Sequence, residues 1–457
     1  MIINVYIVHI ICVIYLSYIA IRKDVENAIP AFCFMIILIP TEAQVQLSGL
    51  FSLTLQRTVL LTMLIFIFFL NRGKKAHNSS GPFPLKYLIL ISIIWGFFSI
   101  FASIQPLTSF KRFLAEIGEY TLLFYILVKT ISNNQTIKNT LIAIVLAMSF
   151  SALFGTVEAY RGWSIASLFP ETTGLFEQHE EFALMGRGYR TSSTFPHAIL
   201  FGGALAIAIP LTLYLLSLTN KWQHKTVLLL SLALMFISIY KTMSRGPWIA
   251  LILSLIILFI FSNTVMRKYI VIIFSIALIT LISRPGVWDT LYGLWDATFD
   301  TETALNSSYE YRYALFRVAR HALDQSSVRQ FFGYGSGTFY DLQLEGEFRG
   351  RIHNFLSCDS SWISMMIGTG YVGLIIALVL FSKITFITWQ NFRFLPSPYN
   401  TLCLVIFSNL IAFFFLMTNV SIYGWGQNGH FIWILISLAI AAGRVFSRIK
   451  EGIIVYK

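Results

Sequence analysis

Long apolar runs recur along the whole chain, separated by short polar connections. A helix needs about 20 apolar residues to cross a bilayer. Backbone in lipid must satisfy its own hydrogen bonds, so apolar runs without alternation predict helices rather than a barrel. The sequence therefore predicts an all-α polytopic membrane protein with about 12–14 transmembrane helices, best counted as about 13. The expected spans are residues 2–20, 30–53 (broken by Pro40), 56–71, 85–104, 111–131, 138–158, 197–218, 226–243, 247–262, 269–283, 359–381, 399–418 and 429–446.

The connections between these runs differ in charge. Alternate connections hold most of the lysines, and the excess of lysine and arginine marks the cytoplasmic side of a membrane protein. This pattern places the C-terminus in the cytoplasm and the N-terminus outside, with an uncleaved first helix. It also places two long connections, residues 160–196 and 284–352, on the outer face. The chain then divides into five parts: N-terminal transmembrane helices (1–158), a first extracytoplasmic loop (159–196), central helices (197–283), a large extracytoplasmic loop carrying part of the active site (284–358) and C-terminal helices (359–457).

Composition agrees with a membrane protein. Only 12% of the residues are charged and 56% are hydrophobic, whereas soluble globular chains carry roughly a quarter charged residues. The net charge of +12 follows from the lysines on the cytoplasmic side and requires no nucleic acid partner. The four cysteines form no CxxC pair, which predicts neither a disulfide framework nor a zinc site.

Both long outer connections contain arginine but no lysine. Arginine presents a planar fork of donors that suits bidentate phosphate contacts; chance and weak selection against outer lysine are the alternative explanation. The stretch 309–322 has apolar residues at helical spacing and predicts an amphipathic helix. The glycine-rich stretch 331–340 predicts a turn, and without the lysine of a phosphate loop it predicts no ATP site. The arginines concerned are Arg161, Arg187, Arg190, Arg284, Arg312, Arg317, Arg320, Arg329, Arg349 and Arg351.

Four clusters on the expected outer face could perform chemistry: RTSSTFPH (190–197), TMSRGPW (242–248), the arginines of the 309–322 helix and RIHN (351–354). Arg245 lies at the membrane boundary, where a cation is a functional candidate, with an arginine reaching lipid phosphate as the alternative. His353 is a candidate base, because histidine titrates near neutral pH. A lone histidine is more often structural, and His197, His321 and His430 are rivals. No carboxylate pair suggests a metal, so no metal and no cofactor are expected.

In these clusters the chain resembles the bacterial O-antigen ligase and O-antigen polymerase superfamily. The resemblance is carried by RTSSTFPH, SRGPW (244–248), YRYALFR (311–317), GYGSGTF (333–339), and the late HN pair before GTGYVGL (368–374). It implies a metal-independent glycosyltransferase with a GT-C-like fold in the bacterial inner membrane, with its active site facing the periplasm. The implied substrates are an undecaprenyl-diphosphate-linked glycan and an acceptor glycan or lipid. A chain-length regulator and a flippase are implied partners, alongside the membrane lipids.

The resemblance also assigns roles to individual residues. Arg245, Arg312 and Arg190 would bind the diphosphate of the donor, and His353 would be the general base. Arg317, Arg320, His197 and Asn354 are additional candidates. Arginines placed at the departing diphosphate would stabilise the charge that develops in the transition state. Whether the reaction is a polymerase or a ligase step stays open.

A polysaccharide transporter or flippase is the main alternative. Transporters tend to have internal repeats and ionisable residues near the middle of the membrane. The chain shows no such repeat, but Glu116 and Glu119 in the fifth expected span favour this alternative.

Overall fold

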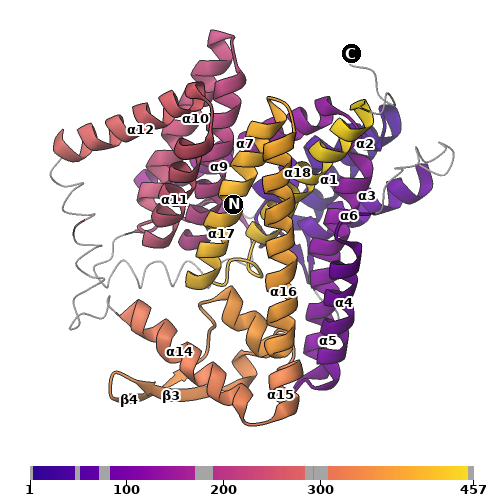
Figure 1. Cartoon of the computed structure of the whole chain (residues 1–457), viewed down its shortest axis with the longest axis vertical. Coiled ribbons are helices and arrows are strands. Elements are labelled where there is room, and N and C mark those ends of the chain that lie inside the picture. The colour runs from indigo at the N-terminus through magenta and orange to yellow at the C-terminus, as the bar shows by residue number, and fades with distance from the viewer. Residues whose placement is uncertain are drawn as a thin grey trace.

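The computed structural model describes residues 4–46, 52–70, 83–169, 189–283, 292 and 307–450 and is almost entirely helical (Figure 1). Arg187 and Arg284 lie outside these residues. A bundle of helices makes up most of the molecule, and a smaller segment of helices and one hairpin packs against one end of it (Figure 1). We call this smaller segment, residues 307–360, the outer segment.

The N-terminal helices are α1 (Val5–Arg22), α2 (Val25–Leu38) and α3 (Leu55–Leu70), which pack against one another. The second expected span, residues 30–53, is wrong in its extent. Pro40 disfavours a helical conformation of the preceding residue, and Ile39 is indeed extended, with ψ 130°. The chain then forms a two-stranded ribbon, β1 (Gln44–Val45) and β2 (Leu53–Thr54), instead of more helix.

The next helices are α4 (Lys86–Phe101) and a composite helix, followed by α7 (Asn134–Arg161) and a short 3-10 turn, η2 (Ile165–Leu168). The composite helix covers the fifth expected span in three pieces: α5 (Pro106–Glu116), the π-helical turn η1 (Ile117–Leu122) and α6 (Leu123–Thr130). A π-helical turn inserts an extra residue per turn and often occurs at functional sites.

The central helices are α9 (Ala198–Leu218), α10 (Trp222–Lys241), α11 (Arg245–Phe261) and α12 (Thr264–Ser283). Helix α9 is the hub of the bundle, with almost all of its residues buried. It contacts α7, α10, α11, α17 and α18. A helix that is apolar all round and surrounded by other helices needs no amphipathic pattern. Helix α12 projects sideways from the bundle (Figure 1).

The outer segment contains α14 (Ser307–Asp324), α15 (Ser327–Phe332), η6 (Tyr340–Leu342) and the hairpin of β3 (Leu344–Phe348) and β4 (Arg351–Phe355). Helix α14 covers the stretch for which apolar spacing predicted a helix. The segment has its own hydrophobic core, which includes Leu315, Leu323 and Phe355. The β hairpin was not predicted.

Helices α16 (Ser361–Phe394), α17 (Tyr399–Asn419) and α18 (Asn428–Lys450) complete the bundle. Gly370 kinks α16 with φ 73° and ψ −177°. A Cβ at this position would lie 2.2 Å from the carbonyl oxygen of Phe331, so the close approach of α15 requires glycine here. The kink therefore lets α15 of the outer segment pack closely against α16.

The described residues include seven helices that are long and apolar enough to cross a membrane, and four shorter apolar helices. This confirms an all-α, multi-pass membrane protein. The number of 13 spans stays a prediction. The long membrane candidates are α1, α7, α9, α10, α16, α17 and α18.

Candidate functional site

The RTSSTFPH segment and the hinge between α10 and α11 are in direct contact. The guanidinium of Arg190 donates to the carbonyl oxygen of Thr242 at 3.0 Å and to Ser244 Oγ at 2.7 Å. The backbone N–H of Thr191 donates to the carbonyl oxygen of Lys241 at 3.2 Å. The structure thus brings two of the four predicted clusters together and places Arg190 on the turn that carries Arg245.

A buried carboxylate at the end of α7 holds the same segment from the other side. Glu158 has no exposed surface. It accepts hydrogen bonds from the backbone N–H groups of Ser192 at 3.1 Å and Ser193 at 2.6 Å, and from the Tyr189 hydroxyl at 3.1 Å. A buried carboxylate is stable only when such donors satisfy it. Glu158 was not among the predicted site residues, although a lone acid within an apolar run is a signal that could have revealed it.

His197 ends the RTSSTFPH segment and caps α9. Its Nδ1 accepts a hydrogen bond from the backbone N–H of Ile199 at 3.1 Å, and its ring lies 5.4 Å from that of Trp425. A capping role of this kind satisfies one of the free N–H groups at a helix start. The structure therefore gives His197 a structural task within the cluster.

Arg312 lies in the outer segment and faces Asp359, which precedes α16. Burial lowers the pKa of the Arg312 guanidinium and raises the pKa of the Asp359 carboxyl, while each charge favours the ionised form of the other. The Tyr311 hydroxyl donates to the carbonyl oxygen of Ser357 at 3.4 Å. Helix α14 is thereby fixed to the chain that leads into α16. Asp359 was not predicted, because its partner is 47 residues away in the sequence.

His353 lies on β4 and packs among aromatic rings. Its ring centroid lies 5.0 Å from that of Phe355 and 5.7 Å from those of Tyr311 and Phe348. These contacts hold the imidazole beside the start of α14, next to the residue that precedes Arg312. The hairpin therefore brings the predicted base and one predicted arginine into neighbouring positions.

The remaining candidates lie further from these groups. Arg317 and Arg320 are exposed on α14: Arg317 lies over the Tyr313 ring at 5.3 Å, and Arg320 pairs with Asp324 at 3.4 Å. Asn354 is exposed on β4. Their positions fit the surface of the outer segment better than the neighbourhood of Arg190.

The end of α17 connects the two groups of candidates. A Cβ on Gly246, next to Arg245, would lie 3.6 Å from Leu416 Cδ2. The hydroxyl of Ser360, next to Asp359, donates to the carbonyl oxygen of Met417 at 3.1 Å. The last turn of α17 is therefore flanked by the Arg245 hinge and by the residues that face Arg312. The start of α11 and the outer segment also lie toward the same end of the molecule in Figure 1.

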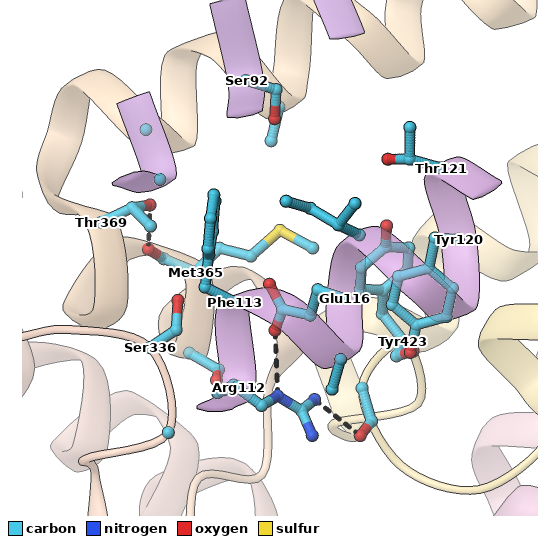
Figure 2. Close-up of a pocket in the computed structure, with 18 of the residues that line it drawn as sticks. Ser92, Arg112, Phe113, Glu116, Tyr120, Thr121, Ser336, Met365, Thr369 and Tyr423 are labelled. Atoms are coloured by element: carbon cyan, nitrogen blue, oxygen red, sulfur yellow. Dashed lines mark hydrogen bonds and ion pairs between the residues drawn. The ribbon is translucent and has the colours of Figure 1, made fainter. Parts of the chain in front are cut away.

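A cavity of about 590 Å³ opens beside this region, between α4, α5, η1 and α16 (Figure 2). Ser361 and Ser364, in the first turn of α16, line it from the side of Asp359. The acids that favoured a transporter are in ion pairs here. Glu116 lies 3.0 Å from Arg112, and Glu119 lies 2.7 Å from Arg57. These carboxylates thus have local partners rather than a continuous series of acids across the membrane.

Within the described ranges, no group of three or more His, Cys, Asp or Glu side chains could hold a metal ion. The donors near Arg190 and Arg312 are guanidinium, hydroxyl and backbone N–H groups. This chemistry is suited to an anion such as a phosphate.

Comparison with curated proteins gives no match. A family model described as O-antigen ligase matches residues 230–378, which include Arg245, Arg312 and His353. The matched region runs from α10 to the kinked helix α16 and takes in the whole outer segment. This match supports the O-antigen ligase-related superfamily for the chain.

Proposed function

We propose that the protein is a membrane glycosyltransferase that moves a glycan from an undecaprenyl-diphosphate donor to a sugar acceptor at the periplasmic face. The observation that supports the proposal is that Arg245, Arg312 and His353 all fall within the region that matches the O-antigen ligase family. The family implies glycan assembly on lipid-linked polysaccharide. The donor, the face of the membrane and the roles of the residues are parts of the proposal.

In this mechanism, Arg245, Arg312 and Arg190 bind the diphosphate of the donor. The bond between the sugar and the diphosphate breaks, and negative charge develops on the departing oxygen. Guanidinium groups already in position stabilise this charge without reorganisation. Arg190 is held by Thr242 and Ser244, and the charge of Asp359 favours the ionised form of Arg312. These contacts give the fixed geometry that the mechanism needs.

The acceptor hydroxyl loses a proton as it attacks the sugar carbon. His353 takes this proton as the general base, a contribution of typically about a hundredfold to ten-thousandfold in rate. The same chemistry would serve a polymerase, which adds a repeat unit to a chain, and a ligase, which transfers a finished chain to another acceptor.

The test uses the purified protein in detergent. No bilayer is present there, so lipid cannot be flipped and only transfer can be detected. The native host's lipid-linked oligosaccharide is supplied together with its acceptor. The proposal expects formation of the extended glycan and release of undecaprenyl diphosphate. If the protein yields neither product but moves the same lipid across vesicle membranes, it is a flippase and the proposed transfer is wrong.

A further inference from the structure

The mechanism above does not use the cavity between α4, α5, η1 and α16. Its lining nevertheless has the hydroxyl and aromatic side chains of a ligand-binding site. Nine serine and threonine residues line it, together with five aromatic residues. Its volume of about 590 Å³ lies within the range of about 300–1,000 Å³ that is usual for small-molecule sites. The nine hydroxyl residues are Ser52, Ser92, Thr108, Thr121, Ser336, Ser361, Ser364, Thr369 and Ser421.

Three cations, Arg57, Lys111 and Arg112, line the cavity, and the two arginines are each paired with a carboxylate. Arg112 donates to Glu116 at 3.0 Å and to the carbonyl oxygen of Gly424 at 2.8 Å, as Figure 2 shows. Arg57 pairs with Glu119 at 2.7 Å. Both arginines therefore already have a carboxylate partner within 3.0 Å, and Lys111 is the remaining cation of the lining, so the lining offers less positive charge than the double charge of a diphosphate would need. Ser361 and Thr369 already donate to backbone carbonyls. The other lining hydroxyls would gain no hydrogen bond from a lipid acyl chain, which makes the cavity a poor match for lipid as well.

One wall is aromatic and held in place. The hydroxyl of Tyr120 donates to the carbonyl oxygen of Tyr423 at 2.7 Å, and the indole N–H of Trp433 donates to the Tyr423 hydroxyl at 3.1 Å. Figure 2 shows Tyr120 and Tyr423 on one side of the cavity, with Ser336 and Thr369 on the other. Aromatic faces opposite hydroxyl groups fit a ligand that has C–H faces and a rim of hydroxyls, which is the chemistry of a sugar.

Two local backbone features shape the two sides of the cavity. The π-helical turn η1 carries Tyr120 and Thr121 into the lining. The glycine-rich turn closes the opposite side, because Gly337 has a φ of 83° and its Cβ would lie 3.3 Å from Arg112 Cβ. Since Ser361 follows Asp359 by two residues, the cavity adjoins the residues that face Arg312. A ligand here would extend toward the proposed transfer site.

We propose that this cavity binds neutral sugar units of the glycan substrate, adjacent to the site where the bond is formed. The inference rests on the proposed function and adds a second part to the site, one that recognises sugar rather than diphosphate. The sugar can belong to the acceptor or to the donor glycan, and the kinetic test below separates these two sources.

The cavity can be filled from two opposite walls. Ser92 on α4 and Thr121 on η1 both line it, and within the described chain neither hydroxyl makes a hydrogen bond whose loss would disturb the fold. We expect Ser92→Trp and Thr121→Phe to occupy the space of the sugar. Leu90→Trp is the matched control, because Leu90 is 46% exposed on the same helix α4 and does not line the cavity. Size-exclusion profiles of the three variants report whether each one folds.

The probe is the oligosaccharide released by mild acid from the host's lipid-linked donor, and its binding is measured by saturation-transfer NMR. We expect at least a tenfold weaker affinity in Ser92→Trp and Thr121→Phe and an unchanged affinity in Leu90→Trp. In the transfer assay, a raised KM for the acceptor identifies an acceptor site, and a raised KM for the donor identifies a donor-glycan site.

The outcomes separate this inference from the proposed function. If wild-type protein transfers glycan, and both cavity variants bind the oligosaccharide and transfer as the wild type does, the cavity is no sugar site while the transferase survives. If the wild type does not bind the oligosaccharide at all, the inference is equally overturned. If the wild type binds it and the cavity variants do not, but no transfer occurs, the sugar site stands and the proposed function falls.

Discussion

Arg190 donates a hydrogen bond of 2.7 Å to Ser244 Oγ and so joins two segments that are 54 residues apart in the sequence. Ser244 precedes Arg245, the first residue of α11. The contact therefore couples the position of one proposed diphosphate ligand to the position of another. Hydrogen bonds to a charged group contribute about 1.5–3 kcal/mol, which is enough to fix this geometry before the substrate arrives.

We expect Arg245→Ala to abolish most of the transfer. Removing one donor to a developing anion costs typically about 2.7–4 kcal/mol of barrier, or about a hundredfold to a thousandfold in kcat. Arg245→Lys keeps the charge but loses the fork of donors, so it should recover only part of the rate. The measurement is kcat for glycan transfer, with the amount of protein in the membrane as a control. Wild-type kcat in Arg245→Ala would remove this residue from the mechanism.

Glu158 should act as a positioning residue. Glu158→Ala leaves the backbone N–H groups of Ser192 and Ser193 without their acceptor, and each buried unsatisfied group costs about 1–3 kcal/mol. We expect both a lower thermal stability and a loss of transfer that exceeds the loss of folded protein. Tyr189→Phe removes only one of the three donors and is the milder control.

A double-mutant cycle separates the two effects of Glu158. If Glu158 acts through the RTSSTFPH segment, the losses of transfer caused by Glu158→Ala and Arg190→Ala should not add, because both release the same segment. Additive losses in kcat would show that Glu158 only supports the fold.

His353→Ala should lower kcat by about a hundredfold to ten-thousandfold, the range for loss of a general base. His321→Ala is the matched control, because His321 is exposed on α14 in the same outer segment. The pH profile of kcat distinguishes a base from a packing residue. The acidic limb of the profile should disappear in His353→Ala, whereas a residue that only fills the aromatic cluster would lower kcat and leave the limb in place.

The sequence predicted most helices because the apolar runs themselves determine where a bilayer can hold the chain. It failed after Leu38, where Pro40 ends the helix and the residues 41–46 that follow are mostly polar. It also missed the hairpin that carries His353. The alternation in residues 344–348 and 351–355 is short, and the turn depends on positive φ angles at Arg349 and Gly350. A tight turn of this kind is hard to recognise without a typical Asn-Gly pair.

The site was predictable as a set of residue types but not as a geometry. The two long connections contain arginine without lysine, and this led to Arg190 and Arg312, whereas the position of Arg245 at an expected membrane boundary led to Arg245. Their partners could not be predicted, since Glu158 and Asp359 are distant in sequence and become relevant only through packing. The cavity was missed for the same reason: its walls come from α3, α4, α5, η1, α16 and the chain before α18, and no local pattern unites them.

The last prediction concerns stability and pH. Glu42 lies in the turn after α2, outside the membrane-spanning helices, and is 7% exposed. Burial raises the pKa of its carboxyl from 4.5 to about 7. Because the folded pKa lies above the unfolded one, the folded state binds the proton more tightly, and stability is greatest below pH 4.5 and declines as the pH rises toward 7. One pKa unit corresponds to about 1.36 kcal/mol, so the total decline has an upper limit of about 3 kcal/mol.

We therefore expect the Tm of the purified protein to fall between pH 5 and pH 8, with Glu42→Gln removing this part of the fall. Glutamine keeps the shape of the side chain and cannot ionise, so the variant should be more stable than the wild type at pH 8 and similar to it at pH 5. Other titrating groups affect both proteins equally, and the difference in Tm between them isolates Glu42. A difference that does not change with pH would mean that the Glu42 carboxyl is already ionised across the whole range and that burial does not raise its pKa.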